Sequence, residues 1–242
     1  ARPVMQGYFN PARSGHGMFL SQAESAWALV WYTYLEDGTP TWYLAANAAP
    51  SGNDGVWRAP LFRLTWNGTT SYANAVGEAM LTFDSASRFT YSWLLDGQYG
   101  SEPFETVPTP SCPSVGGAPV SYSGAWANPA ESGWGFSVNA VSAAEADAAY
   151  VFDSAGVARW LLGVTTAPGA AITMPLLQHR GFCPTCAFNA VTTTPVGTLT
   201  RNYANKASGN VSINAQWQQG VPGTWVRSNA TQQKITVDMP CQ

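Results

Sequence analysis

The sequence contains few charged residues and almost no lysine. Only 10% of its 242 residues are charged, against about 25% in an ordinary soluble domain. Lys206 and Lys234 are the only two lysines. The net charge of −3 provides no basic surface field, so we expect neither nucleic acid nor a membrane surface among the partners.

Long apolar segments are also missing. No stretch approaches the ~20 consecutive apolar residues that a membrane-spanning helix needs. The sequence begins with Ala1 rather than with Met, so we expect a mature chain from which a signal peptide has been removed. Four cysteines and scarce lysine favour an oxidising compartment, which predicts a secreted protein, extracellular or periplasmic.

Signals for helices and for cofactors are poor as well. The alanine-rich stretches 23–28 and 143–149 are short and occupy matched positions, so we interpret both as hairpin ends. The sequence carries no phosphate-binding loop, calcium loop or dinucleotide fingerprint, and we therefore predict no cofactor.

One stretch of the sequence occurs twice. The copy Asn10-Pro-Ala-Arg-Ser-Gly-His-Gly17 aligns with Asn128-Pro-Ala-Glu-Ser-Gly-Trp-Gly135 after a shift of 118 positions. The same shift superimposes Trp42 on Trp160. We infer an internal duplication of two modules of roughly 110–120 residues each, close to the usual size of a domain.

Strand signals are dense in both copies. Residues 26–34 place Trp27, Leu29 and Trp31 on one face, while the other face is also apolar, so neither face can be freely solvated. Gly38 follows Asp37 in a strong hairpin signal, because glycine accepts the positive φ of a tight turn. The strands expected in the first repeat are 4–9, 16–22, 26–34, 39–47, 55–65, 74–83, 87–95 and 98–107.

About eight strands joined by tight turns form an antiparallel meander. Closure of such a meander into an up-and-down barrel removes its exposed edges and leaves an interior for side chains or one small ligand. We therefore predict an all-β protein with barrel repeats at 1–107 and 120–242, and a β-sandwich is the alternative. The linker 108–119 is rich in proline, which predicts a stiff, extended path without a strand ladder.

The repeated loop is the first candidate site. Asn-Pro begins a turn, and Ser-Gly-x-Gly lets backbone pass where a side chain would clash. One interpretation is a strand connector that repeats because the fold repeats. The other is a pocket mouth with polar contacts and aromatic stacking walls. The candidate ligand-binding residues are Tyr8, Asn10, Ser14, His16, Trp42, Trp126, Asn128, Ser132, Trp134 and Trp160.

Two family resemblances accompany this loop. The spacing W-x-N-x-x-x-S, from Trp126 to Ser132, resembles the opening strand and loop of avidin-like binders over about ten residues, and it hints at a barrel. The longer pattern G-x-W-x-N-P-x-x-S-G-x-G followed by D-G-x-P-x-W resembles a repeated module of secreted bacterial proteins. In the second copy Ala155 and Ala158 replace the Asp and Pro of that pattern. This resemblance implies export from a bacterium and transfers no catalytic residue.

The cysteines favour structural disulfides. Cys183 and Cys186 have the spacing of a redox motif, but no helix follows them, and a zinc site would find only His179 nearby. A disulfide within this loop is the favoured interpretation, with redox and metal sites as alternatives. Cys112 and Cys241 each follow the last strand of a repeat and are candidates for a second disulfide, worth about 3–5 kcal/mol.

Two kinds of catalysis are possible. Ser14 and His16 share a face of an extended strand, but His16 becomes Trp134 in the second copy, and no acid partner is evident. A glycosidase would need two facing carboxylates. The carboxylates available for such a pair are Glu78, Asp84, Asp96, Glu102, Glu105, Glu131 and Asp153.

The aromatic content of 13% exceeds what two small cores require. Most of these rings are expected to fill the barrels, while Trp27, Trp31, Trp217 and Trp225 are candidates for an exposed stacking platform. We therefore predict a non-enzymatic protein that binds a carbohydrate or small apolar ligand, with a protein partner as a further option. A secreted polymer hydrolase and a protease-inhibitor-like protein are the alternatives.

Overall fold

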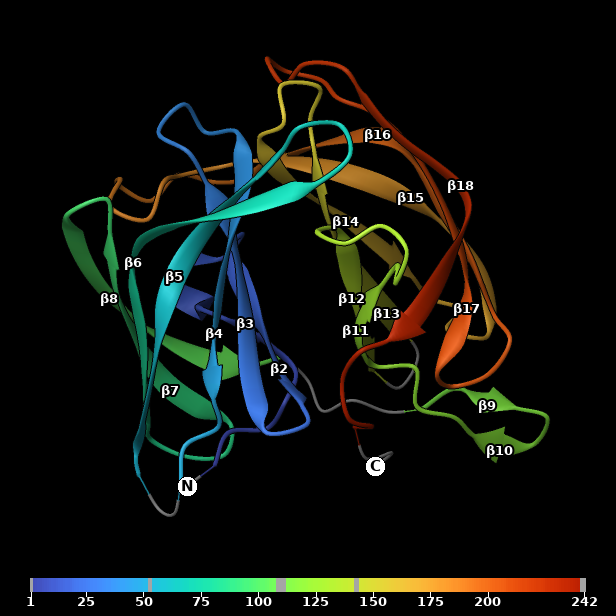
Figure 1. Cartoon of the computed structure of the whole chain (residues 1–242), viewed down its shortest axis with the longest axis horizontal. Helices are drawn as coiled ribbons and strands as arrows, with labels where there is room; N and C mark the ends of the chain where they lie inside the picture. Colours follow the sequence, from blue (N-terminus) through green and yellow to red (C-terminus); the bar gives the residue numbers. More distant parts are fainter. Residues whose placement is uncertain (1, 52–53, 108–111, 142–143, 240–242) are drawn as a thin grey trace.

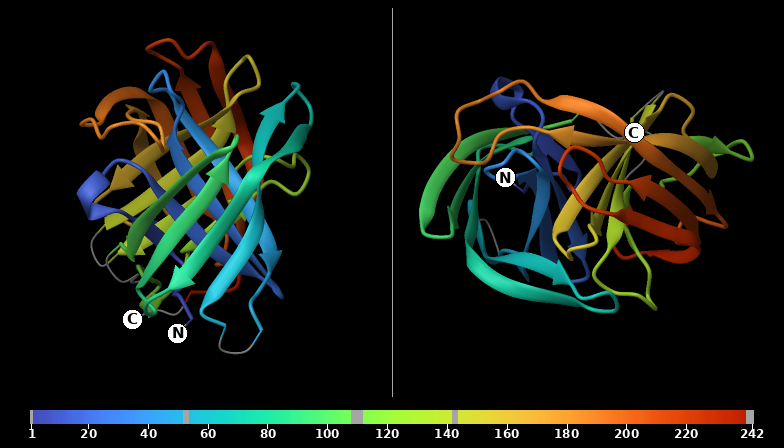
Figure 2. Two further views of the ribbon diagram at one scale, coloured as in Figure 1. Left: turned by 90° about the vertical axis from the view of Figure 1, so that its left-hand side faces the viewer. Right: turned by 90° about the horizontal axis from the view of Figure 1, so that it is seen from above.

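The chain folds into two closed, antiparallel eight-stranded barrels that lie side by side (Figures 1 and 2). The architecture comes from a computed structural model that describes residues 2–51, 54–107, 112–141 and 144–239. The predicted all-β class and the two tandem eight-stranded repeats are confirmed, and closure of both sheets decides against the sandwich. Within the described residues, no helix is long and apolar enough to cross a membrane.

Barrel one contains every strand expected from the first repeat, and β1 pairs with β8 to close it. A short 3₁₀ helix, η1 (Pro11–Arg13), follows β1. The strands are β1 (Gly7–Phe9), β2 (Gly17–Ala23), β3 (Ala26–Tyr34), β4 (Pro40–Ala48), β5 (Val56–Trp66), β6 (Ser71–Phe83), β7 (Arg88–Leu95) and β8 (Gln98–Thr106).

Barrel two repeats this order, and β11 pairs with β18 to close it. Both barrels carry a bulge at the same place, with Val76 of β6 unpaired opposite Leu61/Phe62 and Val196 of β16 unpaired opposite Leu176/Leu177. The strands are β11 (Gly124–Ala127), β12 (Gly135–Val141), β13 (Ala144–Phe152), β14 (Ala158–Thr165), β15 (Ala171–Arg180), β16 (Thr192–Tyr203), β17 (Ser208–Gln216) and β18 (Thr224–Lys234).

The described part of the linker corrects the expectation of an extended path. Strands β9 (Ser114–Val115) and β10 (Ala118–Pro119) pair as a small hairpin that projects beside barrel two (Figure 1). Gly116 and Gly117 form its turn with φ of 61° and 84°, which glycine adopts without strain. Pro119 is tolerated because it ends the strand, where no donor is required.

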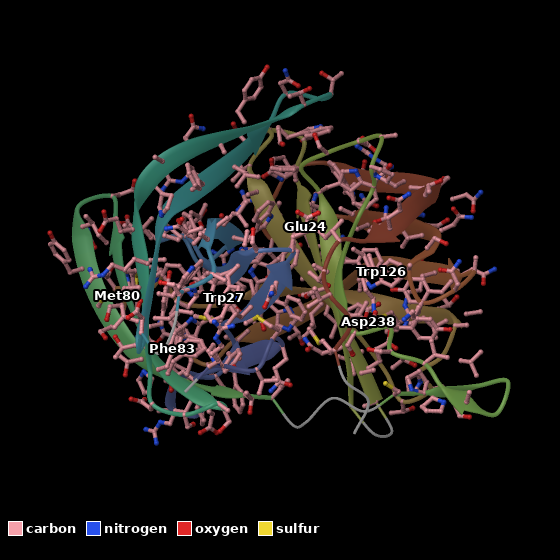
Figure 3. All side chains as sticks on the ribbon, turned by 60° about the horizontal axis from the view of Figure 1, so that its bottom comes forward. Glu24, Trp27, Met80, Phe83, Trp126 and Asp238 are labelled. Atoms are coloured by element: carbon pink, nitrogen blue, oxygen red, sulfur yellow. A yellow bond between two sulfur atoms is a disulfide. The ribbon has the colours of Figure 1, made fainter. Side chains whose placement is uncertain are left out.

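The tryptophans expected to form an exposed platform are buried. Trp27 and Trp31 are 0% exposed, and Trp217 and Trp225 are 5% and 4% exposed. Trp27 lies inside barrel one, as Trp126 lies inside barrel two (Figure 3). That expectation was wrong because the alternation of a strand shows which residues share a face, but not which face turns into the barrel. Trp27 and Trp31 pack in the core of barrel one.

The outer faces of β3, β4, β13 and β14 meet between the barrels. Tyr32 and Tyr150, which the duplication makes equivalent, stack on each other with ring centroids 6.5 Å apart. Their neighbours pack reciprocally: Trp42 against Phe152 at 5.8 Å, and Trp160 against Tyr34 at 5.7 Å. This is the arrangement of a twofold-symmetric dimer interface, formed here within one chain.

Candidate functional site

In barrel one the repeated loop is built around a buried carboxylate. Asn10 caps η1, accepting a hydrogen bond from the amide of Ala12 at 3.0 Å, and its Nδ2 donates to Oε2 of Glu102 at 2.9 Å. Arg13 Nη1 and His16 Nε2 each lie 3.0 Å from the same carboxylate. The loop and the last strand, β8, are thereby joined.

Electrostatics in this group favour an ionised Glu102. Burial alone would raise the pKa of its carboxyl, but the hydrogen bond and charge of His16, together with Asn10 and Arg13, hold that pKa below its usual value. Glu102 is 5% exposed and His16 is 2% exposed. His16 therefore serves this buried network, while Ser14 is exposed, and no Ser–His pair forms.

In barrel two the same loop carries the opposite charge. Asn128 again accepts a backbone hydrogen bond, from Ala130 at 2.9 Å. Glu131, the counterpart of Arg13, accepts hydrogen bonds from Nε of Arg227 on β18 at 2.9 and 3.0 Å. Arg227 lies 5.9 Å over the ring of buried Trp134. The loop is again joined to the last strand, with the polarity of the ion pair reversed.

The other barrel covers each of these loops. A methyl group on Gly15 would come within 2.1 Å of Val191, and one on Gly133 within 2.1 Å of Ser71. Arg13 also donates to the carbonyl of Cys186 at 3.0 Å. These corners connect consecutive strands and also form junctions between the barrels, although Ser132 remains exposed.

The five aromatic candidates are core residues, and Trp134 among them is 3% exposed. Tyr8 is 0% exposed and donates its hydroxyl to the carbonyl of Val4 at 2.7 Å. Trp126 is 1% exposed and donates to the carbonyl of Tyr122 at 3.0 Å. Trp42 and Trp160 are 4% and 2% exposed and lie in the inter-barrel interface. The structure brings none of these five rings to an open surface.

Cys183 and Cys186 form the predicted disulfide within the β15–β16 loop. Cys112 is disulfide-bonded, and Cys241, its expected partner, lies outside the described residues. Within the described ranges, no group of three His, Cys, Asp or Glu side chains is arranged to hold a metal. His179 instead stacks on Trp160 at 4.9 Å, and burial lowers its pKa to about 4.

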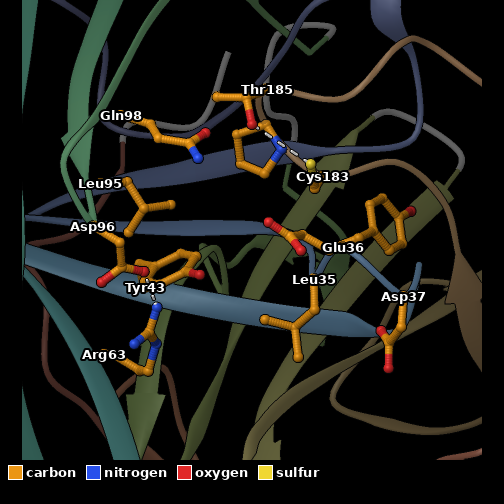
Figure 4. Close-up of a pocket in the computed structure, with 12 residues that line it drawn as sticks. Leu35, Glu36, Asp37, Tyr43, Arg63, Leu95, Asp96, Gln98, Cys183 and Thr185 are labelled. Carbon is orange, nitrogen blue, oxygen red and sulfur yellow. Dashed lines mark hydrogen bonds and ion pairs between the residues drawn. The ribbon is translucent and has the colours of Figure 1, made fainter.

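A cleft of about 430 Å³ lies where the disulfide loop meets barrel one (Figure 4). Gln98, Leu95 and Asp96 lie on one side, facing Glu36 and Thr185 on the other. The full lining is Tyr34, Leu35, Glu36, Asp37, Tyr43, Arg63, Leu95, Asp96, Gln98, Cys183, Pro184 and Thr185.

Fixed polar groups line this cleft. Arg63 pairs with Asp96, and its guanidinium lies 5.7 Å over the ring of Tyr43. Asp37 accepts hydrogen bonds from the amide and hydroxyl of Thr39 at 2.9 and 2.6 Å. Burial acts to raise the pKa of Asp37, but these hydrogen bonds outweigh it, and the pKa lies below its usual value.

A second cleft of about 350 Å³ occupies the related place on barrel two. It combines the β13–β14 turn of residues 153–156, the β5–β6 loop of barrel one and the start of β18. The first cleft likewise combines the β3–β4 turn, a loop of the other barrel and the last hairpin of its own barrel. The duplication has therefore produced two junction clefts with different linings.

Sequence reasoning missed most of the first cleft. Asp96 was considered only as one carboxylate among seven, and Arg63, Gln98 and Glu36 were not considered. The turn at Asp96-Gly97 was the one available signal, since Asp-Gly marks a tight hairpin. The cleft itself depends on how the second barrel docks. No family model, curated protein or solved structure matches this chain.

Proposed function

We propose that this chain is a non-enzymatic binding protein whose first cleft accepts a small hydroxylated ligand, a carbohydrate of one or two rings. The observation that carries the proposal is the cleft of about 430 Å³ between the disulfide loop and barrel one. Its size lies within the roughly 300–1,000 Å³ of ordinary small-molecule sites.

The chemistry of the lining supports a sugar over a purely apolar ligand. Arg63, Asp96 and Gln98 offer planar donors and acceptors on neighbouring positions of one wall, which suits adjacent hydroxyl groups. Leu35 and Leu95 provide apolar surface for the carbon skeleton. A wholly apolar ligand would displace water from these polar groups without offering them hydrogen bonds in return, which is costly.

Secretion and the resemblance to a bacterial module remain proposals. The Cys183–Cys186 disulfide supports a site of action in an oxidising compartment, and we propose a secreted protein on that basis. The resemblance to the repeated module of secreted bacterial proteins stays a prediction.

The geometry supports the hydrolase alternative better than the protease-inhibitor alternative. Glu36 and Asp96 line the same cleft, and this pair keeps a glycoside hydrolase as the second candidate. A protease inhibitor would need a rigid protruding loop. Phe182, Cys183 and Pro184 are buried, and the loop is attached to Arg13, which argues against the disulfide turn as an inhibitory loop.

The test is a calorimetric screen of the whole chain against neutral mono- and disaccharides, with product analysis by chromatography. Arg63→Met should weaken binding of any hit at least about tenfold, since hydrogen bonds to charged groups contribute about 1.5–3 kcal/mol. Arg58→Met is the matched control, because Arg58 is exposed on the same strand, β5, outside the cleft.

The possible outcomes distinguish a binding site, a hydrolase and a cleft that does not bind carbohydrate. Binding without turnover, lost in Arg63→Met alone, supports the proposal. Cleavage of a disaccharide that Asp96→Asn abolishes would replace it with the hydrolase. No binding at millimolar concentration, or equal binding by both arginine variants, would reject the cleft as a carbohydrate site.

A further inference from the structure

The duplication provides an internal reference for the interiors of the two barrels. Their strand registers agree at most pairs: Tyr32 pairs with Trp42 as Tyr150 pairs with Trp160. The β17–β18 pair differs, since it shifts register between Val211 and Ile213 while β7–β8 does not. At closure, Tyr8 pairs with Thr106 as Trp126 pairs with Lys234. Because strand number and register set the diameter of a barrel, the two interiors have similar cross-sections.

The side chains that fill these interiors differ in kind. On β3 the interior positions include Trp27 and Leu29, whereas Glu145 and Asp147 occupy the equivalent positions of β13. The register of the later strands gives two more equivalent positions of this kind. Arg201 stands where barrel one has Leu81, and Gln232 stands where it has Phe104. Four apolar interior positions of barrel one are thus polar in barrel two.

Three of these polar residues form one buried cluster around the guanidinium of Arg201. Arg201 pairs with Glu145, and its Nε lies 3.3 Å from Oδ2 of Asp147. Its Nη1 donates to the carbonyl of Gly169 at 3.0 Å. The guanidinium lies 4.1 Å over the ring of Tyr203. Arg201 is 1% exposed and both carboxylates are 0% exposed, so the cluster lies wholly inside the barrel.

Several polar atoms in this interior have no partner within the protein. They include Oε2 of Glu145, Oδ1 of Asp147, the Tyr203 hydroxyl and both amide atoms of Gln232, a residue that is 0% exposed. Gln232 pairs with Gly209, which pairs with Tyr203, so its side chain faces the same interior. Buried polar groups of folded proteins almost always find a hydrogen-bond partner.

The interior of barrel two also has shorter side chains at large positions of barrel one. Ala149 stands where barrel one has Trp31, and Gly209 stands where it has Phe89. Longer side chains at Leu199 and Met174 offset part of this difference. With similar cross-sections, these shorter side chains should leave more room inside barrel two, and bound water requires both such room and polar partners.

We propose that barrel two encloses ordered water molecules that bridge Glu145, Asp147, Tyr203 and Gln232. Arg201 already provides a positive charge beside the carboxyl groups of this cluster, so a neutral bound molecule fits better than an ion. The bound molecule must both donate and accept hydrogen bonds, because the Gln232 amide and the Tyr203 hydroxyl do both. In barrel one the unpartnered interior atoms are mainly ring groups of Trp27, Trp31, Trp93 and Tyr91, and no ion-pair cluster joins them.

The experiment counts long-lived internal waters in the full chain by magnetic relaxation dispersion of the water signal. Gln232→Phe, which introduces the residue of barrel one, should lose at least one such water. Gln233→Phe is the matched control, because Gln233 is exposed on the same strand, and it should lose none. Equal counts in folded wild type and Gln232→Phe would overturn the proposal.

A second variant keeps the test valid if Gln232→Phe fails to fold. Tyr203→Phe removes only a hydroxyl that has no protein partner. If water binds this hydroxyl, the urea midpoint should fall, because the water loses a partner. If the hydroxyl is truly unpartnered, the midpoint should rise. A rise, or crystallographic density for an organic molecule at the cluster, would contradict the proposal.

Discussion

Trp42 and Trp160 exchange hydrogen bonds across the interface between the two barrels. Trp42 Nε1 donates to the carbonyl of Val151 at 3.2 Å, and Trp160 Nε1 donates to the carbonyl of Thr33 at 2.8 Å. The duplication makes the two donors equivalent and the two acceptors equivalent. The same tryptophan that marks the repeat in the sequence therefore holds the repeats together.

These hydrogen bonds predict matched losses of stability. Trp42→Phe and Trp160→Phe should each cost about 1–2 kcal/mol more than Trp31→Phe, measured by urea unfolding. Trp31 is the control because it is equally buried, while its ring N–H has no partner. Equal costs for all three substitutions would show that ring volume alone matters at the interface.

His179 predicts a loss of stability on the acid side. Its pKa falls from about 6.5 in the unfolded chain to about 4 in the fold, so the folded state resists protonation. The stabilisation is complete above pH 6.5 and is lost as pH falls towards 4, by up to about 3 kcal/mol. His179→Gln should flatten this part of the pH profile, and the NMR shift of the His179 ring should report the low pKa directly. An unchanged profile would contradict the assignment.

The two loop ion pairs should differ in energy. Glu102→Gln should cost about 2–3 kcal/mol, since it leaves Arg13 and His16 beside a neutral group in a buried site. Glu131→Gln should cost less than about 1 kcal/mol, because Glu131 and Arg227 keep 28% and 23% of their side-chain surfaces exposed. Thermal unfolding of both variants tests the order, and a larger loss in Glu131→Gln would contradict it.

Asp147 predicts the opposite pH dependence to His179. Burial raises the pKa of its carboxyl well above the usual value, so the folded state holds a proton that the unfolded chain releases near pH 4. Its contribution to stability is present below about pH 4 and is lost as pH rises through the folded pKa. Asp147→Asn should therefore gain stability relative to wild type as pH rises. Asp54→Asn, at an exposed position, should show no such trend.

Strand periodicity and turn chemistry were sufficient to predict both barrels. The alternation of Trp27, Leu29 and Trp31 and the Asp37-Gly38 turn are local signals, and the shift of 118 positions carried them to the second copy. The Cys183–Cys186 disulfide also followed from spacing and the lack of a helix. These features depend on residues close together in the chain.

The candidate site could not be predicted in the same way. Trp42, which recurs as Trp160, was expected to be a stacking wall of a pocket at the repeated loop, but it is buried in the interface with the second barrel. His16 was expected at a pocket mouth, and Glu102, 86 positions later, holds it in a buried network instead. The cleft around Arg63 forms only when the disulfide loop of one repeat meets the other repeat.

The proposed carbohydrate-binding function depends on the first cleft being the place where the ligand binds. The most direct measurement is a ¹H–¹⁵N NMR titration of the whole chain with the tightest-binding saccharide from the calorimetric screen. We expect shifts concentrated at the Arg63 and Gln98 side chains and at the Thr185 amide, with the Trp42 and Trp160 indole signals unmoved. Shifts confined to residues outside the cleft, such as exposed Tyr72 and Tyr99, would contradict the account.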